Sequence, residues 1–288
     1  DPASIAQRLS DRTRAIVVTH LAGQPSDMDP IMEVARRRGV PVIEDCAQAH
    51  DAVYKGRLAG GIGDLAAFSL MGGKHSTAGG QGGMVLTNDE EWYWRAKRFA
   101  DRGKPFNMNE RRNVSLGLNY RMTELEAAIG RTQLRKLSGV VRRRRALATS
   151  LGDRIADLRA VRLGTVIDGA ESSYWFLLLH VDTSQLRVDH DQFARAVASE
   201  GIPVQARYDH LVYESPWIRE PTTRTFGGSG LPWSLTPEGR AVNYEDSCPN
   251  ARQAIDTHMV VAFHEGYGEQ EMADIAAALR KVEKAYSR

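Results

Sequence analysis

Four short apolar runs, separated by stretches of helical periodicity, constrain the fold of this chain most strongly. They lie at residues 15–20, 40–45, 65–70 and 84–87 and are rich in aliphatic side chains. Strands that alternate with helices form βα units, whose strands run parallel and whose helices cover the sheet. The sequence therefore predicts an α/β fold with a mainly parallel sheet flanked by helices.

Cap signals mark where two of the expected helices begin and end. Asp29 is the expected N-cap of a helix that has Pro30 in its first turn and Gly39 at its end. Thr123 and Glu126 have the spacing of a capping box. This box predicts one long helix, with apolar positions at Leu125, Ile129, Leu137 and Val141.

Polar side chains follow two of the apolar runs. Asp45 closes the run VPVIED, whereas Ser69 and then Lys74 follow the run that begins at Leu65. In open α/β sheets, ligands bind beyond the carboxyl ends of the strands. A lysine amine and a carboxylate are what pyridoxal 5'-phosphate requires: the lysine holds the aldehyde as a Schiff base and the carboxylate keeps the pyridine nitrogen protonated.

Strand geometry separates the two acidic residues at the end of the second run. Successive strand side chains point to opposite faces, so only one of Glu44 and Asp45 can face the crevice, and Asp45 is the candidate. Glycines suit a loop that wraps a flat cofactor, although ordinary tight turns explain them equally well. They surround Lys74 at Gly72, Gly73, Gly79, Gly80, Gly82 and Gly83.

The chain resembles the sugar aminotransferases of the DegT/DnrJ/StrS type, which have the aspartate aminotransferase fold of pyridoxal phosphate enzymes. The resemblance is carried by EDCAQAHDAVYKGRLAGGIGDLAAFSLMGGKHSTAGGQGGMVLTND and by GLNYRMTELEAAIGRTQL. It extends from RTRAIVVTHLAGQPSDMDPI to SCPNARQ and the final helix. We therefore expect a large pyridoxal phosphate domain followed by a smaller α+β domain.

The resemblance implies a role for each matching residue. Lys74 forms the Schiff base and moves the proton, and Asp45 pairs with the pyridinium. Gln48 touches the ring hydroxyl and Ser69 binds the phosphate. Asn119 reaches the phosphate of the neighbouring subunit's cofactor, which implies a homodimer with a shared active site.

Ala47 matches a small residue that packs against the ring face, but other positions depart from the family pattern. The residues that differ from the family pattern are expected to affect the substrate pocket. They are Ala22, Asp51, Leu70 and Gln81. Family members are also longer and carry a leading segment before residue 12. We expect this chain to be a fragment that binds pyridoxal phosphate weakly or folds unstably alone. Absorbance after addition of pyridoxal phosphate tests this, and a stable Schiff base formed in stoichiometric amount would contradict it.

Two domains are expected, the remainder of the large domain at 1–135 and a small domain at 136–288. The second part contains a strong strand in YWFLLLHV and a glycine- and proline-rich stretch at 221–250, a candidate border of the substrate pocket. The run 142–145 is expected to be a solvated helix face or a hinge. A final helix at 270–286 should pack through Met272, Ile275, Leu279 and Val282.

Composition argues against several classes of partner. The formal net charge of +2 implies no nucleic-acid or membrane surface. Two cysteines, Cys46 and Cys248, make no disulfide framework and favour a reducing, cytoplasmic location. The histidines lack metal-ligand spacing, so no metal is predicted. GIGDLA and GGKH lack the context of a dinucleotide site and of a P-loop.

The expected activity is transfer of an amino group from glutamate or glutamine to a nucleotide-linked keto-sugar or to a cyclitol ketone. The donor displaces Lys74, and the freed amine acts as general base, its pKa lowered by burial. One alternative is a sugar dehydratase on the same fold, but the resembling dehydratases carry histidine in place of the lysine. The other is a non-catalytic relative.

Overall fold

The computed structural model describes residues 1–208, 210–219 and 247–288, and these divide into two compact units. The first unit comprises Asp1–Ser150, Thr165–Phe176 and Phe263–Glu269. The second comprises Leu151–Gly164, Leu177–Ala262 and Gln270–Arg288. Most of the stretch 221–250 lies outside the described residues, and a domain boundary at 135–136 stays a prediction.

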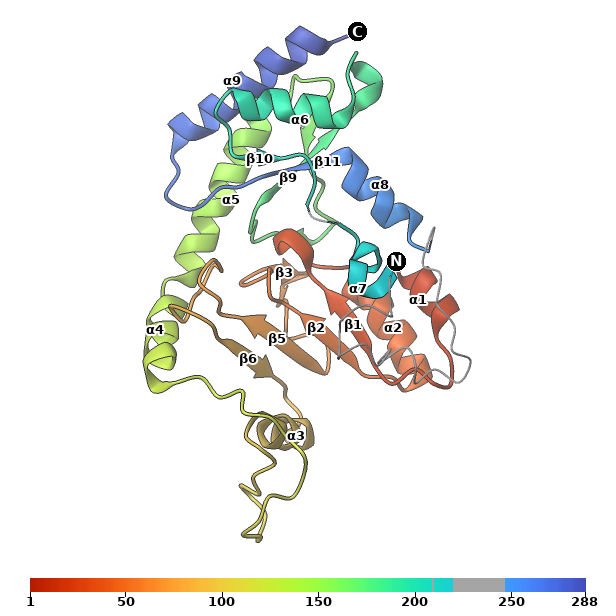
Figure 1. Cartoon of the computed structure of the whole chain (residues 1–288), viewed down its shortest axis with the longest axis vertical. Helices are drawn as coiled ribbons and strands as arrows, with labels where there is room; N and C mark the ends of the chain where they lie inside the picture. The colour runs from red at the N-terminus through yellow and green to blue at the C-terminus, as the bar shows by residue number, and fades with distance from the viewer. Residues whose placement is uncertain (209, 220–246) are drawn as a thin grey trace. The chain divides into compact units, whose positions relative to one another are not determined.

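A four-stranded sheet forms the centre of the first unit (Figure 1). Its order is β1 (Ile16–Thr19), β2 (Val42–Asp45), β5 (Leu65–Ser69) and β6 (Gly83–Leu86). The first three strands are parallel, and β6 pairs antiparallel with β5. The predicted mainly parallel sheet is confirmed, and its carboxyl edge brings together the ends of β1, β2 and β5.

Helix α2 (Met28–Arg38) covers one face of this sheet. Its buried side chains pack with those of β1 and β2 in one cluster, which includes Ile16, Val18, Met28, Ile31, Met32 and Val42. Gly39 ends the helix at φ 63°, as expected. The expected N-cap is wrong, because the helix begins earlier and Asp27 occupies that position. Asp29 lies instead in the first turn and pairs with Lys55 and Arg57.

The remaining elements of the first unit surround the sheet. α1 (Pro2–Arg8) precedes β1, and α3 (Glu90–Ala100) follows β6. A small antiparallel sheet joins β3 (Val53–Tyr54) to β4 (Arg57–Leu58) and β8 (Ala170–Glu171).

The Thr123–Glu126 capping box is present, but the long helix is interrupted. α4 (Glu124–Leu134) ends before Lys136, and α5 (Leu137–Arg154) follows. Leu125 and Ile129 on α4 are exposed, whereas Leu137 and Val141 on α5 are buried. The apolar positions of the two helices therefore do not form one buried stripe in this chain.

The second unit is built on an antiparallel sheet. Its order is β10 (Val204–Gln205), β11 (His258–Val261), β9 (Leu177–Val181) and β7 (Val161–Leu163). The strand expected in YWFLLLHV begins only at Leu177, because Tyr174 has a positive φ of 47°. The helices among its described residues include α6 (His190–Ser199), α7 (Pro216–Arg219), α8 (Pro249–Thr257) and α9 (Glu269–Tyr286). The four predicted contact residues of the final helix are all buried.

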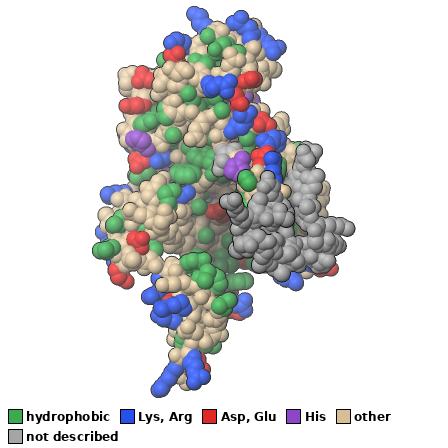
Figure 2. All heavy atoms as spheres, viewed as in Figure 1, with side chains coloured by type: hydrophobic (Ala, Val, Ile, Leu, Met, Phe, Trp, Pro, Cys, Tyr) green, Lys and Arg blue, Asp and Glu red, His purple; other side chains and the backbone are tan. Residues whose placement is uncertain are grey.

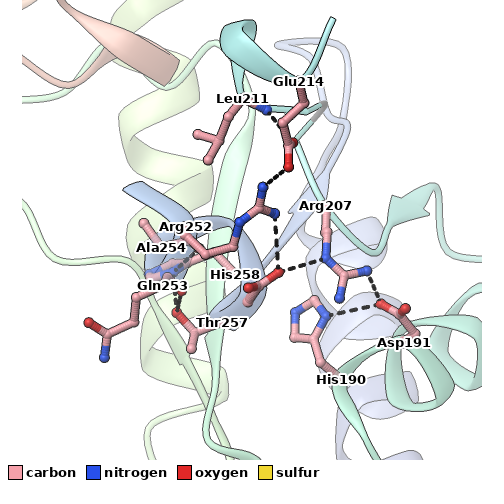
Figure 3. Close-up of polar contacts among 11 residues, drawn as sticks. His190, Asp191, Arg207, Leu211, Glu214, Arg252, Gln253, Ala254, Thr257 and His258 are labelled. Carbon is pink, nitrogen blue, oxygen red and sulfur yellow. Dashed lines mark hydrogen bonds and ion pairs between the residues drawn. The ribbon is translucent and has the colours of Figure 1, made fainter. Parts of the chain in front are cut away.

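A network of ion pairs connects α6, the segment after β10 and α8 (Figure 3). Arg207 pairs with Asp191 and with Asp256, while Arg252 contacts Glu214 and Asp256. All of these side chains are at least one-fifth exposed, so the network has a modest effect on stability. Within the part of the chain that the structure describes, no helix has the length and apolar character needed to cross a membrane.

Candidate active site

Asp45 lies at the carboxyl end of β2, between the ends of β1 and β5. Thr19 and Ala67 are its partners in the strand register. The backbone N–H of Ala47 donates to Oδ1 at 3.0 Å, and the Thr19 hydroxyl lies 3.4 Å from Oδ2. Residues 44 to 47 alternate between buried and half-buried, which leaves Asp45 and Ala47 on the same accessible side.

Glu44 lies on the other face and is fully buried. His20 Nε2 lies 3.0 Å from its Oε2, and backbone N–H groups of Gly60, Ile62 and Gly63 also donate to the carboxylate. Burial raises the pKa of Glu44, but the hydrogen bond from His20 and those from the backbone outweigh it and hold the pKa below its usual value. Glu44 is therefore a structural carboxylate.

His20, Glu44 and Cys46 lie close enough together to suggest a metal site. The N–H of Ser26 donates to Nδ1 of His20, which assigns the ring proton to Nε2, facing Glu44. A protonated ring nitrogen offers no lone pair to a metal. The hydrogen bond between His20 and Glu44 explains the proximity of those two groups without an ion, and Cys46 follows Glu44 by two residues on the same buried face.

Lys74 follows β5 on a glycine-containing turn and is half-buried. Its backbone N–H donates to the carbonyl of Met71 at 3.0 Å. Burial lowers the pKa of the Lys74 amine, and the negative charge of Asp45 opposes that effect. The effect of Asp45 on this pKa indicates that the carboxylate lies in the neighbourhood of the Lys74 amine.

Trp175 lies against the side chain of Lys74. The Lys74 Nζ is 4.0 Å from the centre of the indole ring, and the indole N–H donates to the carbonyl of Gly73 at 3.1 Å. The backbone N–H of Trp175 donates to Ala22 at 3.2 Å. Sequence analysis assigned Trp175 only to an apolar strand, so this contact was missed.

Arg144 holds the segment that carries Trp175. It is 6% exposed, and its guanidinium donates to the carbonyls of Tyr174 and Trp175 at 3.1 and 3.0 Å. It also forms an ion pair with Glu265 at 2.9 Å. The expectation that the run 142–145 is a solvated face is wrong for Arg144, because the carbonyls of an irregular segment need donors.

The other predicted cofactor residues differ in their surroundings. Gln48 and Ala47 lie on the loop after Asp45, and Gln48 Oε1 accepts from the Ala22 N–H at 2.8 Å. Ser69 ends β5, and its hydroxyl lies 3.4 Å from the N–H of Met71. Asn119 is exposed and forms an isolated β-bridge with Asp101; among the described residues its contacts are with that segment rather than with Lys74.

Two buried histidines, His50 and His75, lie near Lys74, and no role for them was predicted from the sequence. The rings of His50 and His75 are 5.6 Å apart. Nε2 of His75 lies 3.0 Å from the carbonyl of Ser173, whereas among the described residues neither ring nitrogen of His50 has a partner in good hydrogen-bond geometry, the backbone of Ser69 being close enough only to act on its pKa. Burial lowers the pKa of His50 to about 4 and that of His75 to about 3. Both rings are therefore neutral at neutral pH.

The residues present fit pyridoxal phosphate. Lys74 is an amine whose pKa is lowered by burial, and Asp45 is a carboxylate whose charge acts on that amine. Half-buried Ala47, Gln48 and Ser69 lie at the same edge. An amine, a carboxylate, an amide and a hydroxyl match the aldehyde, ring nitrogen, ring hydroxyl and phosphate of that group.

Comparison with known proteins gives a consistent result. The model of the DegT/DnrJ/EryC1/StrS aminotransferase family matches residues 1–228. GDP-perosamine synthase of Escherichia coli O157:H7 is 37% identical over 80% of this chain and 62% of its own length. L-glutamine:scyllo-inosose aminotransferase of Streptomyces griseus is 33% identical over 78% of this chain and 55% of its own length. The chain thus spans less than two thirds of these relatives.

A solved aminotransferase from Psychrobacter cryohalolentis has a similar fold. The TM-score is 0.84 at 30% sequence identity, and the superposition covers 99% of this chain and 72% of that one.

Proposed function

Because the chain belongs to the DegT/DnrJ/EryC1/StrS aminotransferase family, whose enzymes depend on pyridoxal phosphate, we propose that it transfers amino groups to sugar ketones. The donor is glutamate or glutamine, and the acceptor is a nucleotide-linked keto-sugar or a cyclitol ketone. The relatives that act on GDP-linked and inosose substrates support this range of acceptors.

One observation carries the proposal, the position of Lys74 relative to Asp45. Asp45 ends β2 and Lys74 follows the neighbouring parallel strand β5, and the charge of Asp45 acts on the Lys74 amine. A single pyridine ring needs a covalent partner at its aldehyde and a carboxylate at its nitrogen. This pairing supports transamination over the alternative readings.

Pyridoxal phosphate, when bound, supplies an electron-accepting ring for the bonds around the amino carbon. Lys74 supplies the amine that attaches the group and that carries a proton between the reacting carbons. Its lowered pKa increases the fraction of neutral amine available as a base. Asp45 stabilises a positive charge on the ring nitrogen, and its own orientation is fixed by Ala47 and Thr19.

The remaining predicted residues orient the cofactor. Gln48 would bind the ring hydroxyl while it accepts from Ala22, and Ser69 would bind the phosphate at the end of β5. Ala47 leaves room for the ring face. Asn119 would bind the phosphate of a second subunit's cofactor, which agrees with its exposed position.

We further propose that the protein acts as a cytoplasmic homodimer. Apolar side chains are exposed before and along α4, and Figure 2 shows further ones on the visible face near α3. The exposed apolar side chains before and along α4 include Leu116, Leu118, Tyr120, Leu125, Ile129 and Leu134. Such a surface supports association with a second copy. Free Cys46 and Cys248 support a reducing compartment.

Replacement of Lys74 by Ala tests the function. The parent chain, treated with pyridoxal phosphate and borohydride, should carry the reduced group on the peptide that contains Lys74, and should aminate a panel of keto-sugars and inososes. Lys74→Ala should do neither, while replacement of the exposed Lys136 by Ala should preserve both. Retained transamination in Lys74→Ala would refute the assignment.

A further inference from the structure

The indole ring of Trp175 lies against the amine that the proposed reaction uses. Lys74 Nζ lies 4.0 Å from the ring centre, well within the range of a cation–π contact. We propose that Trp175 is a positioning residue, which holds the Lys74 amine as a cation against its ring whenever that amine is not attached to the cofactor. This inference rests on the proposed function.

Several hydrogen bonds fix the orientation of the Trp175 ring. Its N–H donates to Gly73, next to Lys74, at 3.1 Å. Its backbone N–H donates to Ala22, and its carbonyl accepts from Arg144 at 3.0 Å. The ring is therefore tied to the loop that carries Lys74, and the backbone of Trp175 is held by a buried arginine. A side chain held in this way offers a defined surface rather than a chance contact.

The charges around Lys74 show what Trp175 adds. Asp45 favours the ammonium, and burial of the amine disfavours it. Among the described residues, His50 and His75 also interact electrostatically with the amine; both are buried and neutral at neutral pH, since burial lowers the pKa of each. Trp175 contributes an attraction for the cation without a charge of its own.

An uncharged partner suits an amine that must be held and released in turn. A second carboxylate beside Lys74 would raise the pKa of the amine further and reduce the fraction that can react. An aromatic ring attracts the ammonium more weakly and attracts the neutral amine hardly at all. Loss of the proton therefore frees Lys74 from Trp175, which couples the position of the amine to its protonation.

The rate at which Lys74 reacts with the cofactor aldehyde measures this effect. The purified chain, freed of cofactor, is mixed with pyridoxal phosphate, and adduct formation is followed by absorbance from neutral to alkaline pH. Borohydride trapping and peptide mass confirm attachment at Lys74. Trp175→Leu should increase the rate at neutral pH by about threefold to tenfold and shift the rate profile to lower pH.

Two variants separate the ring from its hydrogen bond. Trp175→Phe keeps an aromatic face but loses the N–H that binds Gly73, so its rate should stay close to that of the parent chain. Trp94→Leu removes another indole, 5.2 Å from Lys97, and should leave the reaction at Lys74 unchanged. Should Trp175→Leu fail to fold, Trp175→Met provides the ring-free comparison.

The outcomes discriminate clearly. A folded parent chain that forms no adduct at Lys74 even at saturating pyridoxal phosphate overturns the proposed function and this inference with it. Normal adduct formation in the parent, combined with an unchanged rate and pH profile in Trp175→Leu, overturns only the role of Trp175. Equal changes in the Leu and Phe variants would assign the effect to the Gly73 hydrogen bond and also overturn it.

Discussion

Glu44 and Asp45 are adjacent in β2, yet their carboxylates lie on opposite faces of the sheet and have different partners. Glu44 is fully buried and accepts hydrogen bonds from His20 and from backbone N–H groups. Asp45 is half-buried, is oriented by Ala47, and interacts electrostatically with Lys74. The alternation of side chains along a strand thus separates a structural acid from a candidate catalytic one.

Removing each charge in turn should have different consequences. Asp45→Asn keeps an oxygen for the N–H of Ala47, so stability should change by less than about 1 kcal/mol, whereas amino transfer should fall by about 100-fold or more. Glu44→Gln weakens buried hydrogen bonds and should cost about 1–3 kcal/mol. Urea unfolding and steady-state kinetics on both variants check this. An unstable Asp45→Asn protein with normal kcat would reverse the assignment.

Gly23 should be intolerant of any side chain. Its φ is +87°, and an added Cβ would lie 2.5 Å from the backbone nitrogen of Tyr174 and 2.8 Å from Ser173 Oγ. Gly39 also has a positive φ but has no atom within 4 Å of an added Cβ. Gly39→Ala should therefore cost about 1 kcal/mol, the penalty of the left-handed backbone alone.

Gly23→Ala should cost clearly more, because the segment that carries Trp175 must also shift. Thermal or urea unfolding of the two variants measures the difference. Equal losses of stability would show that the close approach of the two segments is absent in solution.

Arg144 should matter far more than its neighbour Arg142. Arg144 is buried, donates to several backbone carbonyls and forms an ion pair with the Glu265 carboxylate, whereas Arg142 is exposed. Arg144→Ala leaves those carbonyls without donors and should cost about 2–4 kcal/mol. Arg142→Ala should change stability by less than about 0.5 kcal/mol. Comparable unfolding midpoints for both variants would argue against the buried position of Arg144.

His50 should make the stability of the protein depend on pH. Burial lowers the pKa of His50 to about 4 from its usual value of 6.5, so between these pH values the unfolded chain binds a proton that the folded chain does not. The contribution of His50 is complete above about pH 6.5 and is lost as the pH falls toward 4.

Replacing His50 by Leu should remove this dependence. Between about pH 7 and pH 5, the variant should lose about 2 kcal/mol less free energy of unfolding than the parent. Urea titrations at the two pH values provide the measurement. Parallel losses in both proteins would indicate that His50 is accessible to protons in the folded state.

Local rules correctly predicted much of the fold. The aliphatic runs became the strands of the main sheet, Gly39 ended α2, and the Thr123–Glu126 box began α4. These features depend on neighbours in the chain. The cap of α2 was assigned to the wrong aspartate because Asp27 and Asp29 both precede an acceptable first turn. The Asp29 carboxylate instead forms ion pairs with Lys55 and Arg57, which are distant in sequence.

The sequence by itself determined that Asp45 ends one predicted strand and that Lys74 follows the next one, since strand period needs only local pattern. That these two strands are neighbours in the sheet is seen in the structure. Only the tertiary structure decided that Trp175 covers Lys74, that Arg144 is buried, and that two neutral histidines lie behind the amine. These contacts join segments far apart in the chain, and their geometry follows from how those segments pack, which no local pattern encodes.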